Sequence, residues 1–170
     1  MKTKAPAWEH KELAVSFLVK RRKNKEQQLL LGYKLTGVVA NLVMPPGGHI
    51  EEGDLGPITA SQREAFEEVN LRPKIRRKVA ELRVRLDGSR QKIKVHIILF
   101  TEWTGRLMNK TREFKWLKFI EFSKIPWELM PPGEHPWFED VLIKRKRRLV
   151  YIHCGKNRKD VISIRSQPLR

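Results

Sequence analysis

One short segment, residues 59–69, constrains most strongly how this chain can fold. Thr59 and Gln62 are three residues apart, the spacing of a capping box, which predicts a helix that begins there and runs through Val69. Three apolar residues are expected to face the core: Ala65, Phe66 and Val69. A helix with one apolar face needs a sheet or another helix to cover it, so the flanking sequence must supply that partner.

Strand-like sequence lies on both sides of this segment. Apolar or alternating runs predict strands, and polar turns at 21–25 and at Asp87-Gly88 predict two hairpins. The expected strands cover residues 13–19, 28–33, 79–86, 92–101, 114–120, 149–153 and 161–164. A second helix is expected from Pro136 to Arg147, with four apolar residues on its inner side: Trp137, Phe138, Val141 and Leu142. This order of elements predicts an α+β fold in which a mixed β-sheet lies between helices.

Length and composition limit how the chain is organised. With 170 residues, of which 40% are hydrophobic and 32% charged, a single domain spanning residues 1–170 is expected, with residues 1–10 as a basic N-terminal arm. The apolar runs are far shorter than the roughly 20 residues that cross a bilayer, and the N-terminus has no apolar signal core. The lone cysteine, Cys154, has no sequence partner for a disulfide or a zinc site. We therefore expect a soluble, cytoplasmic protein without structural zinc.

Acidic side chains crowd together on the first expected helix. Glu64 and Glu68 are four residues apart and Glu67 is three from Glu64, so the three carboxylates share one face or its margin. Crowded like charges destabilise a helix unless a cation neutralises them, and hard oxygen ligands of high charge suit Mg²⁺ or Mn²⁺. Arg63 is close enough to orient these carboxylates by charge-assisted hydrogen bonds. Taken alone, such a cluster is also consistent with a solvated acidic face.

The sequence before this helix favours the metal site. Met44-Pro-Pro-Gly-Gly48 combines prolines, which restrict the backbone, with glycines, which allow a ligand to approach it closely. The loop continues into an acidic, glycine-containing segment that ends at Pro57. Backbone access of this kind is typical of phosphate loops and metal sites, so the loop and the helix are expected to form one functional unit.

These residues together carry a family resemblance. The pattern Gly48-x5-Asp54-x8-Arg63-Glu64-x2-Glu67-Glu68-x-Asn70-Leu71 resembles the Nudix box. It departs from the usual motif in three ways: Asp54 stands where the family has Glu, the spacer before Arg63 is one residue longer, and Asn70 replaces Gly. Asn tolerates the left-handed conformation that Gly supplies at a helix end, and an extra loop residue can be absorbed before the helix starts. None of the three departures removes a helical carboxylate of the motif.

The resemblance implies the Nudix αβα sandwich and the hydrolysis of a nucleoside diphosphate linked to another moiety. A divalent metal activates the attacking water in that family, which implies Mg²⁺ (or Mn²⁺) as the cofactor here. The implied metal ligands are the Gly47 carbonyl and the three carboxylates of Glu64, Glu67 and Glu68. Arg63 would orient these ligands. Glu113 lies in a segment that resembles the family's acidic loop, which implies that it supports the ligands or accepts a proton, although a solvated loop acid is an equal interpretation.

A second, weaker match lies further along the chain. Residues 115–126 and 130–138 are similar to MutT-type enzymes that hydrolyse oxidised purine nucleoside triphosphates. Where such an enzyme has its base-reading Asn, Trp and first Asp, this chain has Met44, Pro131 and Gly133. Only Glu134 keeps an acidic group in this region. Four residues are expected to bind the substrate: Met44, Gly47 and Gly48 in the loop as a phosphate site, and Glu134 as the acid that the match retains. The leading expectation is a (d)NTP pyrophosphohydrolase of the 8-oxo-dGTP diphosphatase type, which releases a nucleoside monophosphate and pyrophosphate.

The charge of the chain also makes RNA a candidate partner. The net charge is +17, and from Val141 onward ten basic residues stand against a single acid, Asp160. A positive surface attracts nucleotides and RNA alike, although a basic run is also commonly a solvated face. Two alternatives therefore stay open: an RNA 5′-pyrophosphohydrolase or decapping-like enzyme, and a non-catalytic Nudix-fold RNA-binding module. The complete set of glutamates favours an enzyme over the second alternative.

Overall fold

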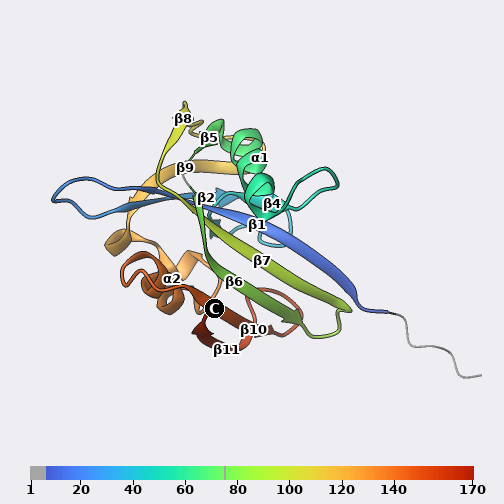
Figure 1. Ribbon diagram of the computed structural model, residues 1–170. Coiled ribbons are helices and arrows are strands. Elements are labelled where there is room, and N and C mark those ends of the chain that lie inside the picture. The colour runs from blue at the N-terminus through green and yellow to red at the C-terminus, as the bar shows by residue number, and fades with distance from the viewer. Residues whose placement is uncertain (1–6, 75) are drawn as a thin grey trace, which may run out of the picture.

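A mixed β-sheet forms the body of the protein (Figure 1). The computed structural model describes residues 7–74 and 76–170, and within them the main sheet has nine strands. Their order is β11-β10-β6-β7-β1-β2-β3, with β4 paired to β1 and β9 paired to β2, while β5 and β8 form a separate pair. The strands are β1 (Glu9–Lys20), β2 (Gln28–Lys34), β3 (Val43–Met44), β4 (Gly47–His49), β5 (Leu71–Pro73), β6 (Arg76–Leu86), β7 (Gln91–Phe100), β8 (Trp103–Gly105), β9 (Phe114–Glu121), β10 (Arg148–Cys154) and β11 (Val161–Pro168). The helices are α1 (Pro57–Val69) and α2 (Glu134–Leu142), with single 3-10 turns at η1 (Phe122–Lys124) and η2 (Trp127–Leu129).

Both parallel and antiparallel pairs occur in the main sheet, which confirms the expected mixed sheet. β1 runs parallel to β7, and β6 runs parallel to β10. The expected hairpin across Asp87-Gly88 is β6–β7. The other expected hairpin, β1–β2, pairs only beside its turn. Further along, β2 pairs with β3 instead of β1, while β9 pairs with β2 from its first residue onward. β1 begins at Glu9, so the end of the expected N-terminal arm is strand, and residues 1–6 of that arm lie outside the described residues.

The two helices cover opposite sides of the sheet, and each has its own core (Figure 1). Successive residues of a strand point to opposite faces. Leu18 of β1 packs in the cluster that contains Ala65 of α1. Its neighbour Phe17 packs in the cluster that contains Trp137 of α2, and these two rings stack with centroids 5.8 Å apart. The αβα sandwich is therefore confirmed. No helix in the described part of the chain is long and apolar enough to cross a membrane.

The helix α1 begins earlier than the sequence pattern predicts. Its N-cap is Gly56, and the next residue is a proline, whose fixed φ suits the first turn and whose missing N–H has no partner there anyway. Thr59 therefore lies inside the helix, where its hydroxyl accepts a hydrogen bond from the Gly56 N–H at 3.1 Å. Asn70 ends the helix in the expected left-handed conformation (φ 61°). The expectation that Phe66 faces the core is wrong: its side chain is 42% exposed, and Arg72 stacks on the ring at 4.3 Å.

The helix α2 is shorter than predicted. Gly133 caps it in the left-handed region (φ 82°), and it runs only from Glu134 to Leu142. The prediction that it reaches Arg147 is wrong because five consecutive cations, residues 144–148, repel one another on a helix. Arg145 takes a left-handed φ of 54°, and the chain turns into β10 instead.

Candidate active site

The glycine-rich loop is held against α1 by backbone pairing. β4 pairs antiparallel with β1, which sets Gly48 opposite Ala14. A side chain at Gly48 would place its Cβ 2.4 Å from the carboxyl carbon of Glu64, so this carboxylate would have to move away from the loop. The Gly47 N–H donates a hydrogen bond to Oε2 of Glu68 at 3.0 Å. The loop and the helix therefore meet at the two buried glutamates of α1.

The acidic cluster consists of the three α1 glutamates with Asp54 and Glu113. Arg63 contacts three of these acids: Asp54, Glu64 and Glu67. Its guanidinium contacts Asp54 through two hydrogen bonds, Nε to Oδ1 at 3.1 Å and Nη2 to Oδ2 at 3.0 Å, and this contact lowers the pKa of Asp54. Nη1 donates to Glu64 at 3.0 Å and to Glu67 at 3.1 Å. Nη2 also donates to the His49 carbonyl at 3.0 Å. The longer spacer still brings Asp54 to Arg63, and Arg63 ties the loop to the helix.

Lys34 contacts the other two acids of the cluster, Glu68 and Glu113. It ends β2, and its Nζ lies 2.5 Å from Oε2 of Glu113 and 3.4 Å from Oε1 of Glu68. Glu113 directly precedes β9, and the pairing of β9 with β2 sets Phe114 opposite Lys34. An acid far along the chain thus reaches α1. The sequence pattern does not mark Lys34 as a candidate, because a lysine at the end of an apolar strand is common.

Burial changes the protonation of the helix glutamates. It raises the pKa of Glu68 to about 8 despite the nearby Lys34. Burial also raises the pKa of Glu64, against the opposing effect of Arg63. The pKa of Glu113 is lowered because it pairs with Lys34. Burial therefore makes the charged form of both carboxyls less favourable than in an exposed glutamate, and a nearby divalent cation would reverse that effect.

The donor set of the cluster fits a divalent metal in its chemistry. The three helix glutamates offer carboxylate oxygens and Gly47 offers a carbonyl, all hard donors of the kind that Mg²⁺ prefers. In residues 7–74 and 76–170, no three acidic, histidine or cysteine side chains already converge into a metal cage. Instead, Arg63 forms ion pairs with Glu64 and Glu67, and Lys34 forms one with Glu68. A metal would have to compete with these two cations.

Two other expected substrate contacts differ in their surroundings. Met44 ends β3, opposite Gly32 and three residues before Gly47, so it borders the loop. Glu134 begins α2, on the other side of the sheet from α1 (Figure 1), where it is 5% exposed and pairs with Arg158. Burial raises the pKa of Glu134 to about 7, against the effect of Arg158. The structure places Met44 beside the glycine-rich loop and Glu134 in the core under α2. Their roles in substrate binding stay predictions.

Comparisons with known proteins identify the family of the chain and relatives of its fold. The sequence profile of the NUDIX domain matches residues 10–141. The fold is similar to that of mutator MutT from Bacillus halodurans, with a TM-score of 0.77 and 20% identity over 94% of this chain and 99% of that chain. It is also similar to the E. coli ORF135 protein, with a TM-score of 0.61 and 20% identity over 81% of this chain and 92% of that chain. The NUDIX domain of Shewanella oneidensis NrtR, complexed with ADP ribose, gives a TM-score of 0.64 and 13% identity over 83% of this chain and 90% of that chain. A comparison with curated protein sequences gives no match.

Proposed function

The chain belongs to the NUDIX domain family, and on that premise we propose that it hydrolyses a nucleoside triphosphate to a nucleoside monophosphate and pyrophosphate, with Mg²⁺ or Mn²⁺ as cofactor. The observation that supports this most is the convergence of two separate segments on α1: Asp54 through Arg63, and Glu113 through Lys34. A solvated acidic face would not bury two of its glutamates, as α1 buries Glu64 and Glu68.

The residues of the cluster have distinct tasks in this reaction. The three helix glutamates, with the Gly47 carbonyl, would hold the metal. A divalent metal, when bound, neutralises phosphate oxygens and makes water more acidic. Arg63 fixes the carboxylates of Glu64 and Glu67 by hydrogen bonds of 3.0 and 3.1 Å. Glu113 stays ionised beside Lys34, so it can accept the proton that the attacking water loses as one P–O bond of the anhydride breaks.

The loop from Met44 to Gly48 is the proposed phosphate site. Gly47 and Gly48 present backbone without side chains, and each lies against a glutamate of α1. The proposed substrate is an oxidised purine nucleotide such as 8-oxo-dGTP. The similarity of residues 115–126 and 130–138 to MutT-type enzymes, and the likeness in fold to a protein described as mutator MutT, support this choice.

A substrate screen tests the proposal. Purified full-length protein is incubated with nucleoside triphosphates including 8-oxo-dGTP, with ADP-ribose and with 5′-triphosphate RNA, in Mg²⁺ or in EDTA, and the products are separated by chromatography. We expect a nucleoside monophosphate and pyrophosphate, formed only with metal. Hydrolysis of RNA ends alone would favour the RNA 5′-pyrophosphohydrolase, and no hydrolysis of any of these would favour the non-catalytic module.

A further inference from the structure

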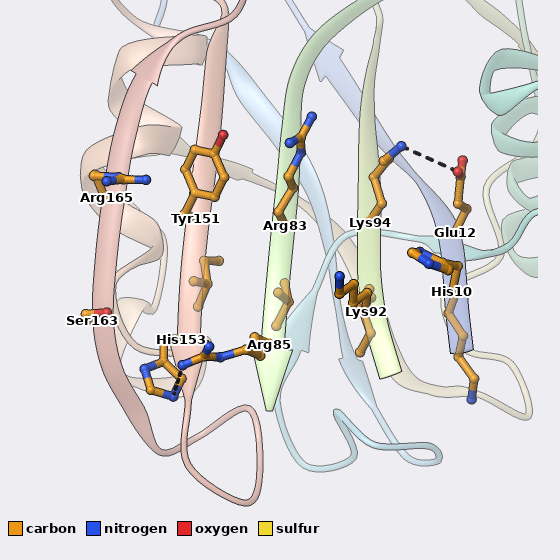
Figure 2. Close-up of a pocket in the computed structure, with 14 residues that line it drawn as sticks. His10, Glu12, Arg83, Arg85, Lys92, Lys94, Tyr151, His153, Ser163 and Arg165 are labelled. Carbon is orange, nitrogen blue, oxygen red and sulfur yellow. Dashed lines mark hydrogen bonds and ion pairs between the residues drawn. The ribbon is translucent and has the colours of Figure 1, made fainter. Parts of the chain in front are cut away.

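The sheet face that carries α1 extends beyond the helix as an open groove. Every second residue of β1 lies on this face. Ser16 contacts Ser61 of α1 through their hydroxyls at 2.6 Å. Further along, Glu12 and His10 line a groove of about 780 Å³, whose floor is formed by five adjacent strands, β11, β10, β6, β7 and β1 (Figure 2). The groove therefore shares a face with α1 without containing any residue of the glutamate cluster.

Two rows of polar side chains cross the floor of this groove. Strand pairing sets the first row in the order Arg165, Tyr151, Arg83, Lys94 and Glu12. The same pairing sets the second row in the order Ser163, His153, Arg85, Lys92 and His10. Neighbouring strands are about 4.8 Å apart, so each row spans about 19 Å. Figure 2 shows both rows along the same stretch of the sheet.

Positive charge dominates these rows. Arg83 pairs with Glu81 at 3.1 Å, and Lys94 pairs with Glu12 at 3.6 Å. Within the residues that the structure describes, the other three cations of the rows form no ion pair with a carboxylate: Arg85, Lys92 and Arg165. Uncompensated cations on adjacent strands repel one another, and a polyanion in the groove would remove that repulsion.

Aromatic rings accompany these cations. The guanidinium groups of Arg165 and Arg83 lie 4.8 and 5.7 Å from the ring centroid of Tyr151. Trp8, just before β1, is 49% exposed, and the Lys92 ammonium lies 5.1 Å from its ring centroid. In proteins that hold single-stranded nucleic acid, cations contact the phosphates while aromatic rings and guanidinium planes stack on the bases. A polyanion without bases would use the charges but not the rings.

We propose that this groove binds a single-stranded segment of RNA. The bases of a duplex are stacked inside it and could not reach rings on the floor of a sheet, whereas those of a single strand could. Glu12, Ser163 and His10 add hydrogen-bonding groups at the two ends of the rows. A 2′-hydroxyl can bond to such groups, and deoxyribose cannot. The binding uses none of the residues proposed for hydrolysis, so it stands or falls independently of the proposed activity.

Removal of the three unpaired charges is the first test. The variant Arg85→Gln/Lys92→Gln/Arg165→Gln is compared with a matched control, Lys23→Gln/Lys25→Gln/Lys156→Gln, which removes the same charge from exposed positions outside the groove. The probe is a fluorescein-labelled twelve-nucleotide oligouridylate with a 5′-hydroxyl, which has no anhydride to hydrolyse. Its anisotropy is followed during titration with full-length protein in EDTA, over a series of salt concentrations.

The two triple variants should differ clearly. We expect the groove variant to bind the probe at least about 30-fold more weakly. The slope of log affinity against log salt should become shallower by about 2, since three cations are removed and each single-strand phosphate contact contributes about 0.7. The control should change affinity by less than about threefold, because scattered charges act only through the screened field. Equal losses in the two variants would overturn the groove as the binding site.

Base stacking is tested with variants that remove an aromatic ring and leave the net charge of the protein unchanged. Trp8→Ala and Tyr151→Leu should each weaken oligouridylate binding about tenfold while the salt slope stays the same. Unchanged affinity in both variants would overturn base stacking. The deoxy form of the same oligonucleotide should bind about fivefold more weakly, for want of the 2′-hydroxyl. Equal or tighter binding of the deoxy form or of an RNA duplex would overturn the assignment to single-stranded RNA.

Discussion

Two buried glutamates, Glu68 on α1 and Glu134 on α2, differ in the charges that surround them. Burial raises the pKa of both, to about 8 for Glu68 and about 7 for Glu134. Glu68 shares its cation, Lys34, with a second acid, Glu113. Glu134 pairs with Arg158 inside the core under α2. The comparison teaches that burial alone does not mark a functional acid. What distinguishes the α1 cluster is a shortage of positive charge, which an external cation can supply.

The largest expected effect is a loss of turnover when the glutamates of α1 are changed. Glu67→Gln and Glu68→Gln should each lower kcat by about 10²–10⁴-fold, because each removes negative charge from the proposed metal site. Glu134→Gln is the matched control and should keep kcat within about threefold. Initial rates of nucleotide hydrolysis in saturating Mg²⁺ measure these effects, and unfolding midpoints check that the variants fold. Near-normal rates in both α1 variants would place the chemistry elsewhere, and a raised KM in Glu134→Gln would make Glu134 a substrate contact.

Loss of the arginine that positions the carboxylates should have the next largest effect. Arg63→Ala should lower kcat about 10–100-fold, because the carboxylates that it holds lose their orientation. Extra Mg²⁺ should restore only part of the rate, since it does not rebuild the hydrogen bonds. The control is Arg72→Ala, an arginine just beyond α1 that stacks on Phe66 and should change kcat less than about twofold. Full recovery of Arg63→Ala at high Mg²⁺ would argue against an orienting role.

The ionisation of Glu134 should appear in stability rather than in rate. Its pKa is about 7 in the folded protein against 4.5 for an ordinary glutamate. The folded state therefore binds this proton more tightly, and the free energy of unfolding should fall as the pH rises from about 4.5 to about 7. At about 1.4 kcal/mol per pKa unit, the loss is on the order of 3 kcal/mol.

Glu134→Gln cannot ionise, so it isolates this contribution. Urea unfolding of the native protein and the variant at about pH 5 and about pH 7.5 should show a steeper loss of stability in the native protein. The same pH dependence in both proteins would mean that Arg158 keeps Glu134 ionised throughout. Glu134 would then have enough positive charge beside it, in contrast to Glu68.

The smallest effect is expected from the basic C-terminal section. Four exposed lysines that lie outside both the α1 cluster and the α2 core can be changed together to glutamine: Lys144, Lys146, Lys156 and Lys159. Turnover of a small nucleotide should change less than about twofold, because charges beyond a Debye length are largely screened. Rates at physiological salt measure this, and a tenfold loss would mean that these lysines contact the substrate.

The sequence predicts the α1 half of the site because that half is local. Arg63, Glu64, Glu67 and Glu68 lie within six residues, and helical spacing alone sets which of them share a face. Asn70 likewise ends the helix as its residue type favours. The exposure of Phe66 could not be predicted in this way, because it depends on what packs against α1.

The other half of the site depends on strand pairing between distant segments. Lys34 reaches Glu113 only because β2 pairs with β9 in one register, and a shift by one residue would turn every side chain to the other face. The two rows of the groove depend in the same way on the pairing of five strands. Such registers are set by the whole sheet, so the residue pattern of a single strand does not reveal them.

Direct metal binding tests the central claim, that the acids of α1 lack a cation which a divalent metal supplies. Binding of Mn²⁺ to the native protein, Glu68→Gln and Glu134→Gln is followed by electron paramagnetic resonance of the free ion, without substrate. The native protein and Glu134→Gln should have the same Kd, and Glu68→Gln should bind at least about tenfold more weakly. Equal Mn²⁺ binding by the native protein and Glu68→Gln would contradict the account.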